Sequence, residues 1–141
     1  MSIDLFRKFV TAKLMSKKII VSDKVSPAVG PYSQGIAWNQ LIFLAGQIPV
    51  DVATGKLVEG DVKAQTKQVL ENIKALLNSA GSSLEKVLKA SVFLVDLKQF
   101  ALMNEVYRDY FNQKPPARST IQVTALPLGA QVEIEVIAYR D

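Results

Sequence analysis

The chain of 141 residues contains no cysteine and no histidine. The absence of cysteine excludes disulfides, thiolate metal sites and a thiol nucleophile. The absence of histidine removes the commonest general base and the commonest metal ligand, so a Ser-His type catalytic triad is excluded as well. Any acid–base chemistry must therefore use carboxylates, tyrosine, lysine, backbone groups or ordered water.

The sequence also lacks long apolar runs and the short motifs of several cofactor sites. Its apolar stretches, such as Leu41–Gly46, are far too short to span a bilayer. The pair Gly30 and Gly35 has neither the spacing nor the following helix of a dinucleotide- or phosphate-binding loop. No metal-ligand pattern appears. We therefore expect no membrane contact, no metal ion and no cofactor.

Positive charge is concentrated near the start of the sequence, although the formal net charge is only +4. Residues 1–18 hold five basic residues and one acidic residue, whereas residues 19–141 hold twelve of each. A neutral domain lacks the basic footprint of a nucleic-acid binder. We therefore expect no nucleic-acid partner.

Two parts of the chain are predicted, an N-terminal extension over residues 1–16 and a single domain over residues 17–141. Four apolar residues recur at helical spacing in the extension: Ile3, Phe6, Val10 and Leu14. Two interpretations stay open, a segment packed on the domain surface or a mitochondrial presequence, against which Asp4 and the scarcity of arginine and serine speak. A cytoplasmic location is favoured over the mitochondrial alternative. Met15 would also serve as an internal start.

The hydrophobic pattern predicts strands and helices in the order βββαβαββ. Runs of alternating or continuously apolar residues predict strands at residues 18–22, 32–38, 41–47, 87–95, 118–123 and 131–139. The third of these is continuously apolar up to Gln47, which is typical of a strand buried on both faces. Turn residues occupy positions 51–55.

Helix boundaries are marked by capping residues. Asp61 is a candidate N-cap for a helix that Gly81 terminates, and this is the clearest helix in the sequence. Asp96 and Gln99 form a capping-box signature ahead of a second helix, which ends at the Pro115-Pro116 pair. Ser82 and Glu85 have the same spacing ahead of a short turn.

The order of elements predicts an α+β domain with two helices on one face of a mixed sheet, because each helix has one apolar stripe to bury. Such a packing leaves the second face of the sheet uncovered. An uncovered apolar face is a physical reason to expect oligomerisation through the sheet.

Two polar side chains fall at positions that invite explanation. Asn104 lies four residues after Phe100 and three before Tyr107, hence on the apolar stripe of its predicted helix. A buried amide without a hydrogen bond costs about 1–3 kcal/mol, so Asn104 is either a structural residue that caps a neighbouring backbone group or an amide that faces a cleft. Arg118, at the start of a strand, is by itself typical of a solvated or ion-paired surface residue.

The last predicted strand carries two carboxylates on one face, Glu133 and Glu135. Such a pair usually marks a wet sheet face, but if partner subunits bury it, at least one carboxylate needs a partner or a raised pKa. A buried glutamate within reach of water is a candidate proton carrier in a chain without histidine. Gly46 marks either a bulge or a close approach of ligand or second chain, and Tyr32 is typical of a half-buried aromatic at a sheet edge.

These residues belong to a longer pattern of six segments. The segments are Pro31-Tyr32-Ser33-Gln34-Gly35, Ala45-Gly46-Gln47-Ile48-Pro49, Val92-Phe93-Leu94-Val95-Asp96, Asn104-Glu105-Val106-Tyr107, Pro116-Ala117-Arg118-Ser119 and Val132-Glu133-Ile134-Glu135. In this order they resemble the Rid (reactive intermediate deaminase) family, and its RidA branch most closely, over residues 17–141. The most specific part is Pro-Ala-Arg-Ser with a glutamate fifteen residues after the arginine.

The resemblance implies a chorismate-mutase-like fold, a homotrimer and clefts between subunits. Arg118 matches the family's arginine that binds the substrate carboxylate, and Glu133 matches the acidic residue that positions and activates the attacking water. Tyr32, Gly46 and Asn104 match positions that line the cleft.

Two positions show where members of the family vary. Thr120, which the resemblance places against the substrate, stands where many members have cysteine and others threonine, so thiol chemistry is dispensable. Ala45 stands where many members have serine, which removes one hydrogen bond from the expected site.

The activity that the resemblance implies is hydrolytic deamination of 2-aminoacrylate and related enamines and imines, 2-iminopropanoate and 2-iminobutanoate, to 2-keto acids and ammonia. Pyridoxal-phosphate-dependent serine and threonine dehydratases release such intermediates, so we expect a functional link to them. A reaction that is already fast in water needs only positioning and proton transfer, which suits a site without metal or cofactor.

Two other functions stay open. A carboxylate-binding cleft would also serve a non-catalytic protein that senses keto acids. Ribonuclease activity or translation inhibition has been ascribed to members of the family, but the neutral domain and the absence of histidine speak against RNA cleavage.

Overall fold

The computed structural model describes residues 1–14 and 16–141, with the side chains of Lys13 and Leu14 left out. The helices are α1 (Ile3–Leu14), α2 (Val62–Ser79) and α3 (Phe100–Tyr110), and 3-10 turns occupy Leu84–Lys86, Leu97–Gln99 and Pro127–Gly129. The strands are β1 (Lys17–Ile20), β2 (Gly35–Trp38), β3 (Leu41–Leu44), β4 (Val50–Asp51), β5 (Lys56–Leu57), β6 (Val87–Leu94), β7 (Ala117–Gln122) and β8 (Val132–Tyr139).

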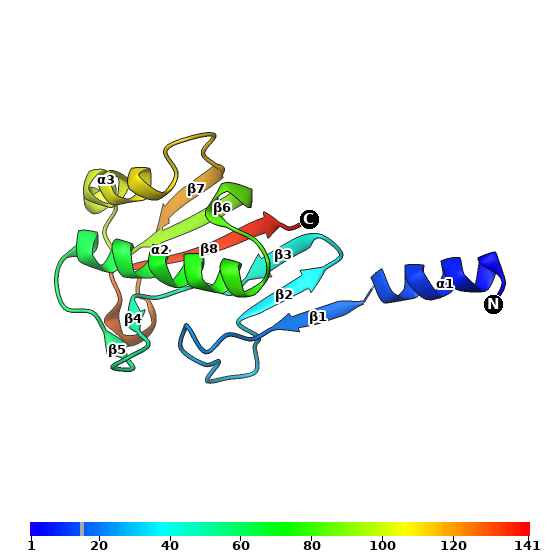
Figure 1. Cartoon of the computed structure of the whole chain (residues 1–141). Helices are drawn as coiled ribbons and strands as arrows, with labels where there is room; N and C mark the ends of the chain where they lie inside the picture. Colours follow the sequence, from blue (N-terminus) through cyan, green and yellow to red (C-terminus); the bar gives the residue numbers. More distant parts are fainter. Residues whose placement is uncertain (15) are drawn as a thin grey trace.

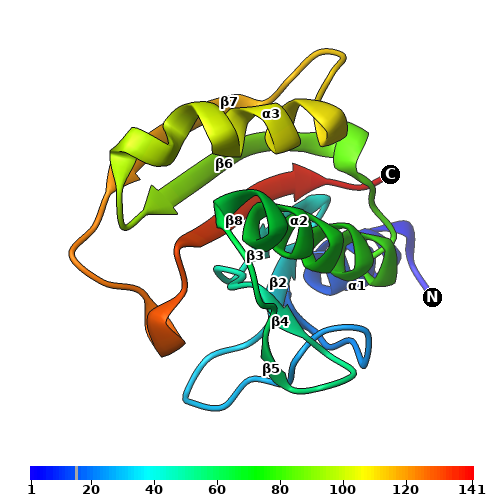
Figure 2. The ribbon, with the colours of Figure 1, turned by 90° about the vertical axis from the view of Figure 1, so that its left-hand side faces the viewer.

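A six-stranded mixed sheet forms the framework, in the order β1-β2-β3-β8-β6-β7. Its strands pair antiparallel except β6 and β7, which are parallel and joined through α3. Helices α2 and α3 lie on the same side of this sheet (Figures 1 and 2). The predicted α+β architecture is therefore confirmed. The short hairpin of β4 and β5 around the turn at residues 51–55 was not among the predicted strands.

Local signals set the helix boundaries as expected. The Asp61 side chain accepts a hydrogen bond from the Ala64 N–H at 3.0 Å, and Gly81 follows α2 with a φ of +76° that favours glycine. Asp96 accepts a hydrogen bond from the Lys98 N–H at 3.0 Å and so caps the turn that leads into α3. Ser82 does not cap the turn after α2 as predicted. Its hydroxyl instead donates to the Tyr139 carbonyl at 2.6 Å.

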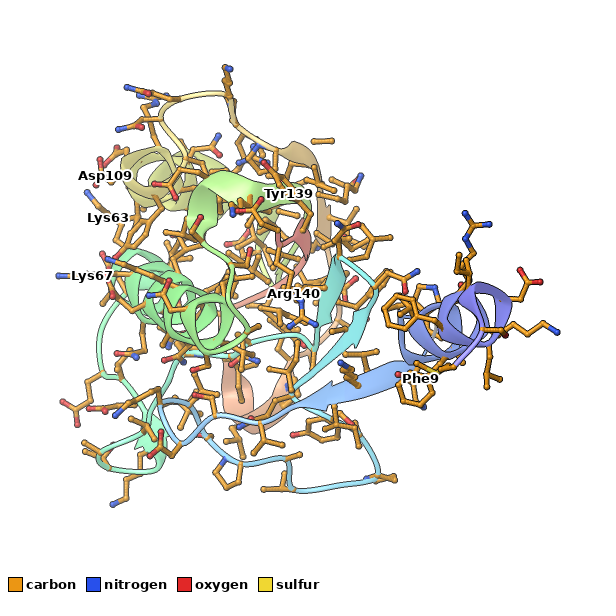
Figure 3. All side chains as sticks on the ribbon, turned by 45° about the vertical axis from the view of Figure 1, so that its right-hand side comes forward. Phe9, Lys63, Lys67, Asp109, Tyr139 and Arg140 are labelled. Atoms are coloured by element: carbon orange, nitrogen blue, oxygen red, sulfur yellow. The ribbon has the colours of Figure 1, made fainter. Side chains whose placement is uncertain are left out.

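The two helices and the inner face of the sheet enclose the core. Fully buried side chains come from α2, β3, β6, β8 and α3: Ile42, Leu70, Ile73, Leu76, Leu77, Leu94, Met103 and Ile134. On the surface, Lys63 of α2 forms an ion pair with Glu105 of α3 at 2.6 Å, and Asp109 lies beside Lys63 (Figure 3).

Strand β3 corrects one prediction. The run at residues 41–47 was expected to be buried on both faces, but Leu41 is 39% exposed and Phe43 is 40% exposed, whereas Ile42 and Leu44 are buried. The strand thus alternates between the core and an open face. The reason is that nothing in the described part of a single chain covers the second face of the sheet.

That second face, here called the open sheet face, is largely apolar near β1, β2 and β3. Its side chains include Ile19, Ile36, Trp38, Leu41, Phe43, Ile121, Ile137 and Tyr139, and the pairing registers place them on the side opposite α2 and α3. Glu133, Glu135, Ser91 and Ser119 continue the same face toward β7.

Helix α1 has the predicted helical form but does not pack on the domain surface. Ile3 is 73% exposed and Phe9 is 64% exposed, and Figure 1 shows α1 extending from β1 away from the sheet. Helical spacing alone cannot decide whether an apolar stripe finds a surface to bury against. Met15, which we considered as an internal start, lies outside the described residues, as does the Leu14 side chain.

Candidate functional site

The guanidinium of Arg118 is held in place by residues of α3. Its Nη1 donates a hydrogen bond to the Asn104 Oδ1 at 2.8 Å. Its Cζ lies 4.6 Å from the centre of the Tyr107 ring and 5.4 Å from that of Phe100. Two cation–π contacts and an amide therefore fix the plane of the guanidinium before any ligand arrives.

Within the described part of the chain, no carboxylate balances the charge of Arg118. Among the residues that the structure describes, the ion pairs involve only lysines, and no carboxylate pairs with Arg118. The side chain is half-buried. An oriented, half-buried guanidinium without a counter-ion is suited to a carboxylate ligand, because it can bind both oxygens at once.

Two buried hydroxyl groups lie near this arginine. The Thr120 Oγ1 forms no hydrogen bond with described residues, whereas the Tyr107 hydroxyl interacts with the Arg118 guanidinium. Thr120 lies two residues after Arg118 on β7 and so shares its face of the sheet. Burial raises the pKa of the Tyr107 hydroxyl, and the positive charge of Arg118 partly offsets this effect. A buried hydroxyl without a partner marks a place where a polar ligand or water is accommodated.

Glu133 on β8 lies against Gly46. The backbones of Gln47 and Ile134 exchange hydrogen bonds of 2.9 and 3.1 Å, which brings the segment after β3 alongside the Glu133 side chain. A Cβ at position 46 would overlap the carboxylate of Glu133. Glycine leaves room for the carboxylate in this position, whereas a larger residue would require the Glu133 side chain to move.

Burial raises the pKa of the Glu133 carboxyl above its ordinary value, and the negative charge of Glu135 raises it further. Both effects disfavour the charged form. A carboxylate with a raised pKa is a stronger base toward water than an ordinary surface glutamate, as a group that takes up a proton during catalysis must be.

A cavity of about 180 Å³ opens beside Gly46. It is lined by Pro27, Val29, Tyr32, Gln34, Gly46, Gln47, Ile48, Val50, Asn72 and Leu128, among others. Tyr32 is 53% exposed at its edge, and its hydroxyl accepts a long hydrogen bond of 3.4 Å from the Val29 N–H. Gly46 is thus shared, since it lines this cavity with Tyr32 and also lies against the Glu133 carboxylate.

The predicted site residues thus form two halves that a single chain does not bring together. Arg118 on β7 pairs with Ala90 of β6, whose side chain faces the core. Glu133 on β8 pairs with Phe93 of β6, whose side chain faces the opposite side of the sheet. Arg118 and Thr120 consequently project toward α3, which carries Asn104, and Glu133 projects onto the open sheet face. Within one chain the guanidinium and the carboxylate do not face one another, because the register places them at positions of opposite parity.

Tyr107 was not predicted to belong to a site. It was recognised only as part of the apolar stripe of its helix, yet its spacing of three from Asn104 already placed both on one face. Leu128, which lines the cavity beside Gly46, was not predicted either and carried no signal in the sequence.

Comparisons with known proteins define the class. A family model described as endoribonuclease L-PSP matches residues 23–140. A RutC family protein of Pyrococcus abyssi is 50% identical over 127 residues, which are 90% of this chain and 100% of that protein. The 2-iminobutanoate/2-iminopropanoate deaminase of Bos taurus is 45% identical over 122 residues, covering 86% of this chain and 89% of that protein.

The fold agrees with this relationship. The crystal structure of RidA from an Antarctic Psychrobacter superposes with a TM-score of 0.83 at 46% identity, covering 86% of this chain and 98% of that one. The chain therefore belongs to the endoribonuclease L-PSP family and, within it, to the Rid proteins. Its fold is the chorismate-mutase-like fold of that family. The predicted resemblance is confirmed.

No three carboxylate side chains cluster into a metal-binding group among residues 1–14 and 16–141. Within the same residues, no helix has the length and apolar character needed to cross a bilayer.

Proposed function

We propose that this protein is a Rid-type deaminase that hydrolyses 2-imino acids derived from enamines such as 2-aminoacrylate. The enamine tautomerises to its imine, water adds to C2, and the C–N bond breaks. The products are a 2-keto acid and ammonia, so one water is consumed per turnover. Serine and threonine dehydratases that use pyridoxal phosphate supply such enamines.

The observation that carries the proposal is the state of Arg118. It is oriented by Asn104 and by the Tyr107 ring, and it has no carboxylate partner in the described chain. A bidentate bond to the substrate carboxylate contributes about 1.5–3 kcal/mol and fixes the plane of the imine. The imine carbon C2 is then open to attack from one face of that plane only.

Glu133 supplies proton transfer in this proposal. Its carboxylate takes a proton from the attacking water and returns one to the departing nitrogen. The raised pKa, caused by burial and by Glu135, brings its proton affinity closer to what a neutral solution requires. Tyr32 and the cavity beside Gly46 hold the remainder of the substrate.

The two halves of the site are completed by a second copy of the chain. Arg118 and Glu133 lie on opposite faces of one sheet, so a substrate that touches both must lie between subunits. The apolar open sheet face is the surface available for that association. We propose a homotrimer with three equivalent clefts, each built from the α3–β7 side of one subunit and the β3–β8 side of the next.

The direct test is an assay of imine loss, with 2-aminoacrylate generated in situ by a serine dehydratase. We expect the wild-type protein to accelerate the loss and to form stoichiometric keto acid. Glu133→Gln should lose rate but still bind 2-oxobutanoate, because the guanidinium is untouched. Binding without turnover by the wild-type protein would instead favour a keto-acid sensor.

Shared clefts are tested by mixing two inactive variants. Arg118→Ala and Glu133→Gln chains, co-expressed in equal amounts, should regain about a quarter of the wild-type activity, because one cleft in four then receives both native residues. Each variant expressed alone is the control. No recovery in mixed trimers would show that both residues act from the same chain.

A further inference from the structure

Leu128 has a backbone conformation that leucine avoids. It lies in the Pro127–Gly129 turn with φ 59° and ψ 12°, in the left-handed region. A Cβ is strained there, so glycine and asparagine are the usual occupants. Asn39, at φ 54° in the turn between β2 and β3, is an ordinary example from the same chain.

Packing does not explain the leucine. Its side chain is 73% exposed, and it is absent from the buried core. The turn is closed by backbone hydrogen bonds, from the Gly129 N–H to the Leu126 carbonyl at 3.2 Å and from the Ala130 N–H to the Pro127 carbonyl at 3.1 Å. Neither bond requires a leucine side chain. A strained residue that contributes little to the fold is best explained by a role in binding.

Leu128 lies next to the residues of the proposed site. Leu128 lines the cavity beside Gly46, together with Tyr32 and the apolar residues Val29 and Ile48. The Glu133 carboxylate occupies the space where a Cβ of the same Gly46 would be. An exposed apolar side chain therefore stands at the wall of the cavity that adjoins the proposed base.

We propose that Leu128 is a specificity-determining residue, which selects 2-imino acids with an apolar side chain of two or more carbons over smaller or polar ones. This inference rests on the proposed function and names its preferred substrate class. The cavity supports it, since about 180 Å³ lined by Pro27, Val29, Ile48 and Val50 leaves room for an alkyl group. Burying one methylene in such a site changes specificity by about tenfold or more.

The test compares two ratios in each variant. One is kcat/KM for 2-iminobutanoate over 2-iminopropanoate, and the other is the affinity for 2-oxobutanoate over pyruvate, which requires no turnover. Leu128→Ala should lower both ratios by about threefold to tenfold and leave Tm nearly unchanged, because the strained backbone remains.

Leu128→Asn separates strain from specificity. Asparagine tolerates the left-handed conformation, so Tm should rise by about 2–4 °C, while both ratios fall. The matched control is Lys114→Asn, since Lys114 is also exposed at a positive φ of 44° but does not line the cavity beside Gly46. It should raise Tm without changing either ratio.

The outcomes distinguish the two proposals. An active wild-type enzyme whose ratios are the same in all three variants would overturn the role of Leu128 and leave the deaminase proposal standing. A wild-type protein without turnover would overturn the deaminase proposal, and the affinity ratio would then decide whether Leu128 selects the ligand. A ratio that also falls in Lys114→Asn would contradict a local effect at the cavity.

Discussion

The two halves of the proposed site differ in how much of their environment the chain itself supplies. Around Arg118, the α3–β7 half is complete, with an amide and two aromatic rings fixing the side chain. Around Glu133, the β3–β8 half is open, because the carboxylate projects onto the open sheet face. In the proposed function, the group that binds the substrate is thus prepared in each chain, whereas the proposed base requires a second subunit to complete its surroundings.

We expect the largest loss of activity from a substitution of Arg118, in the α3–β7 half. Arg118→Ala should lower kcat/KM for 2-aminoacrylate by about a thousandfold, because the substrate loses both binding energy and orientation. Arg118→Lys is the matched control. It keeps the charge but loses the planar fork, and we expect it to recover only part of the rate. Steady-state kinetics with Arg118→Ala as active as wild type would contradict the central role of this half.

A steric change tests the open half. Gly46→Ala should lower kcat by about a hundredfold, because the added Cβ displaces the Glu133 carboxylate from its position beside the backbone. The double variant Gly46→Ala/Glu133→Asp has a shorter acid and should recover part of that loss. Kinetics of the single and double variants measure this coupling, and strictly additive effects would show that the two residues do not interact.

The pH dependence distinguishes the halves further. Because the pKa of Glu133 is raised, kcat/KM should fall about tenfold per pH unit below that pKa. Glu135→Gln removes the neighbouring negative charge and should shift this acid limb to lower pH. A pH–rate profile of both proteins is the measurement, and an unchanged limb would show that another group titrates.

The raised pKa of Glu133 also predicts how the stability of the fold depends on pH. A carboxyl whose pKa is higher in the folded than in the unfolded state destabilises the fold once pH rises above its unfolded value. Glu133→Gln should therefore raise the free energy of unfolding at neutral pH, with the difference vanishing in acid. Denaturant titrations at the two pH values test this, and a variant less stable at neutral pH would mean that the charged form is favoured.

We expect the smallest loss of activity from a substitution of Asn104, which orients Arg118. Asn104→Ala removes the hydrogen bond of 2.8 Å but leaves both aromatic contacts, so kcat/KM should fall about tenfold, mainly through KM. Asn112→Ala, an exposed amide beyond the end of α3, is the control and should leave kinetics unchanged. Equal losses in the two variants would point to a general effect on α3.

Local sequence patterns predicted helix boundaries well where a particular residue type is needed at that position. Asp61 and Gly81 mark both ends of α2, because a cap and a left-handed turn each require particular residue types. Prediction was weaker where burial decides. Residues 41–46 contain no polar side chain, yet β3 is half-exposed in one chain, since a strand on an uncovered sheet face resembles a fully buried one in composition.

The candidate site shows the same division. Its residue types could be read from the sequence, and a chain without histidine or cysteine left a carboxylate as the candidate base. The support of Arg118 by Asn104 followed only in part, from helical spacing. The strain at Leu128 could not be predicted, because a Pro-Leu-Gly segment does not specify a positive φ.

The sequence by itself determined which side chains are available for chemistry and which face of each helix is apolar. Only the tertiary structure decided that Arg118 and Glu133 point to opposite sides of the sheet. Alternation along a strand fixes the relative facing of residues within it, but the relation between β7 and β8 depends on the registers that each forms with β6. Those registers are set by packing across the whole sheet, which no local pattern encodes.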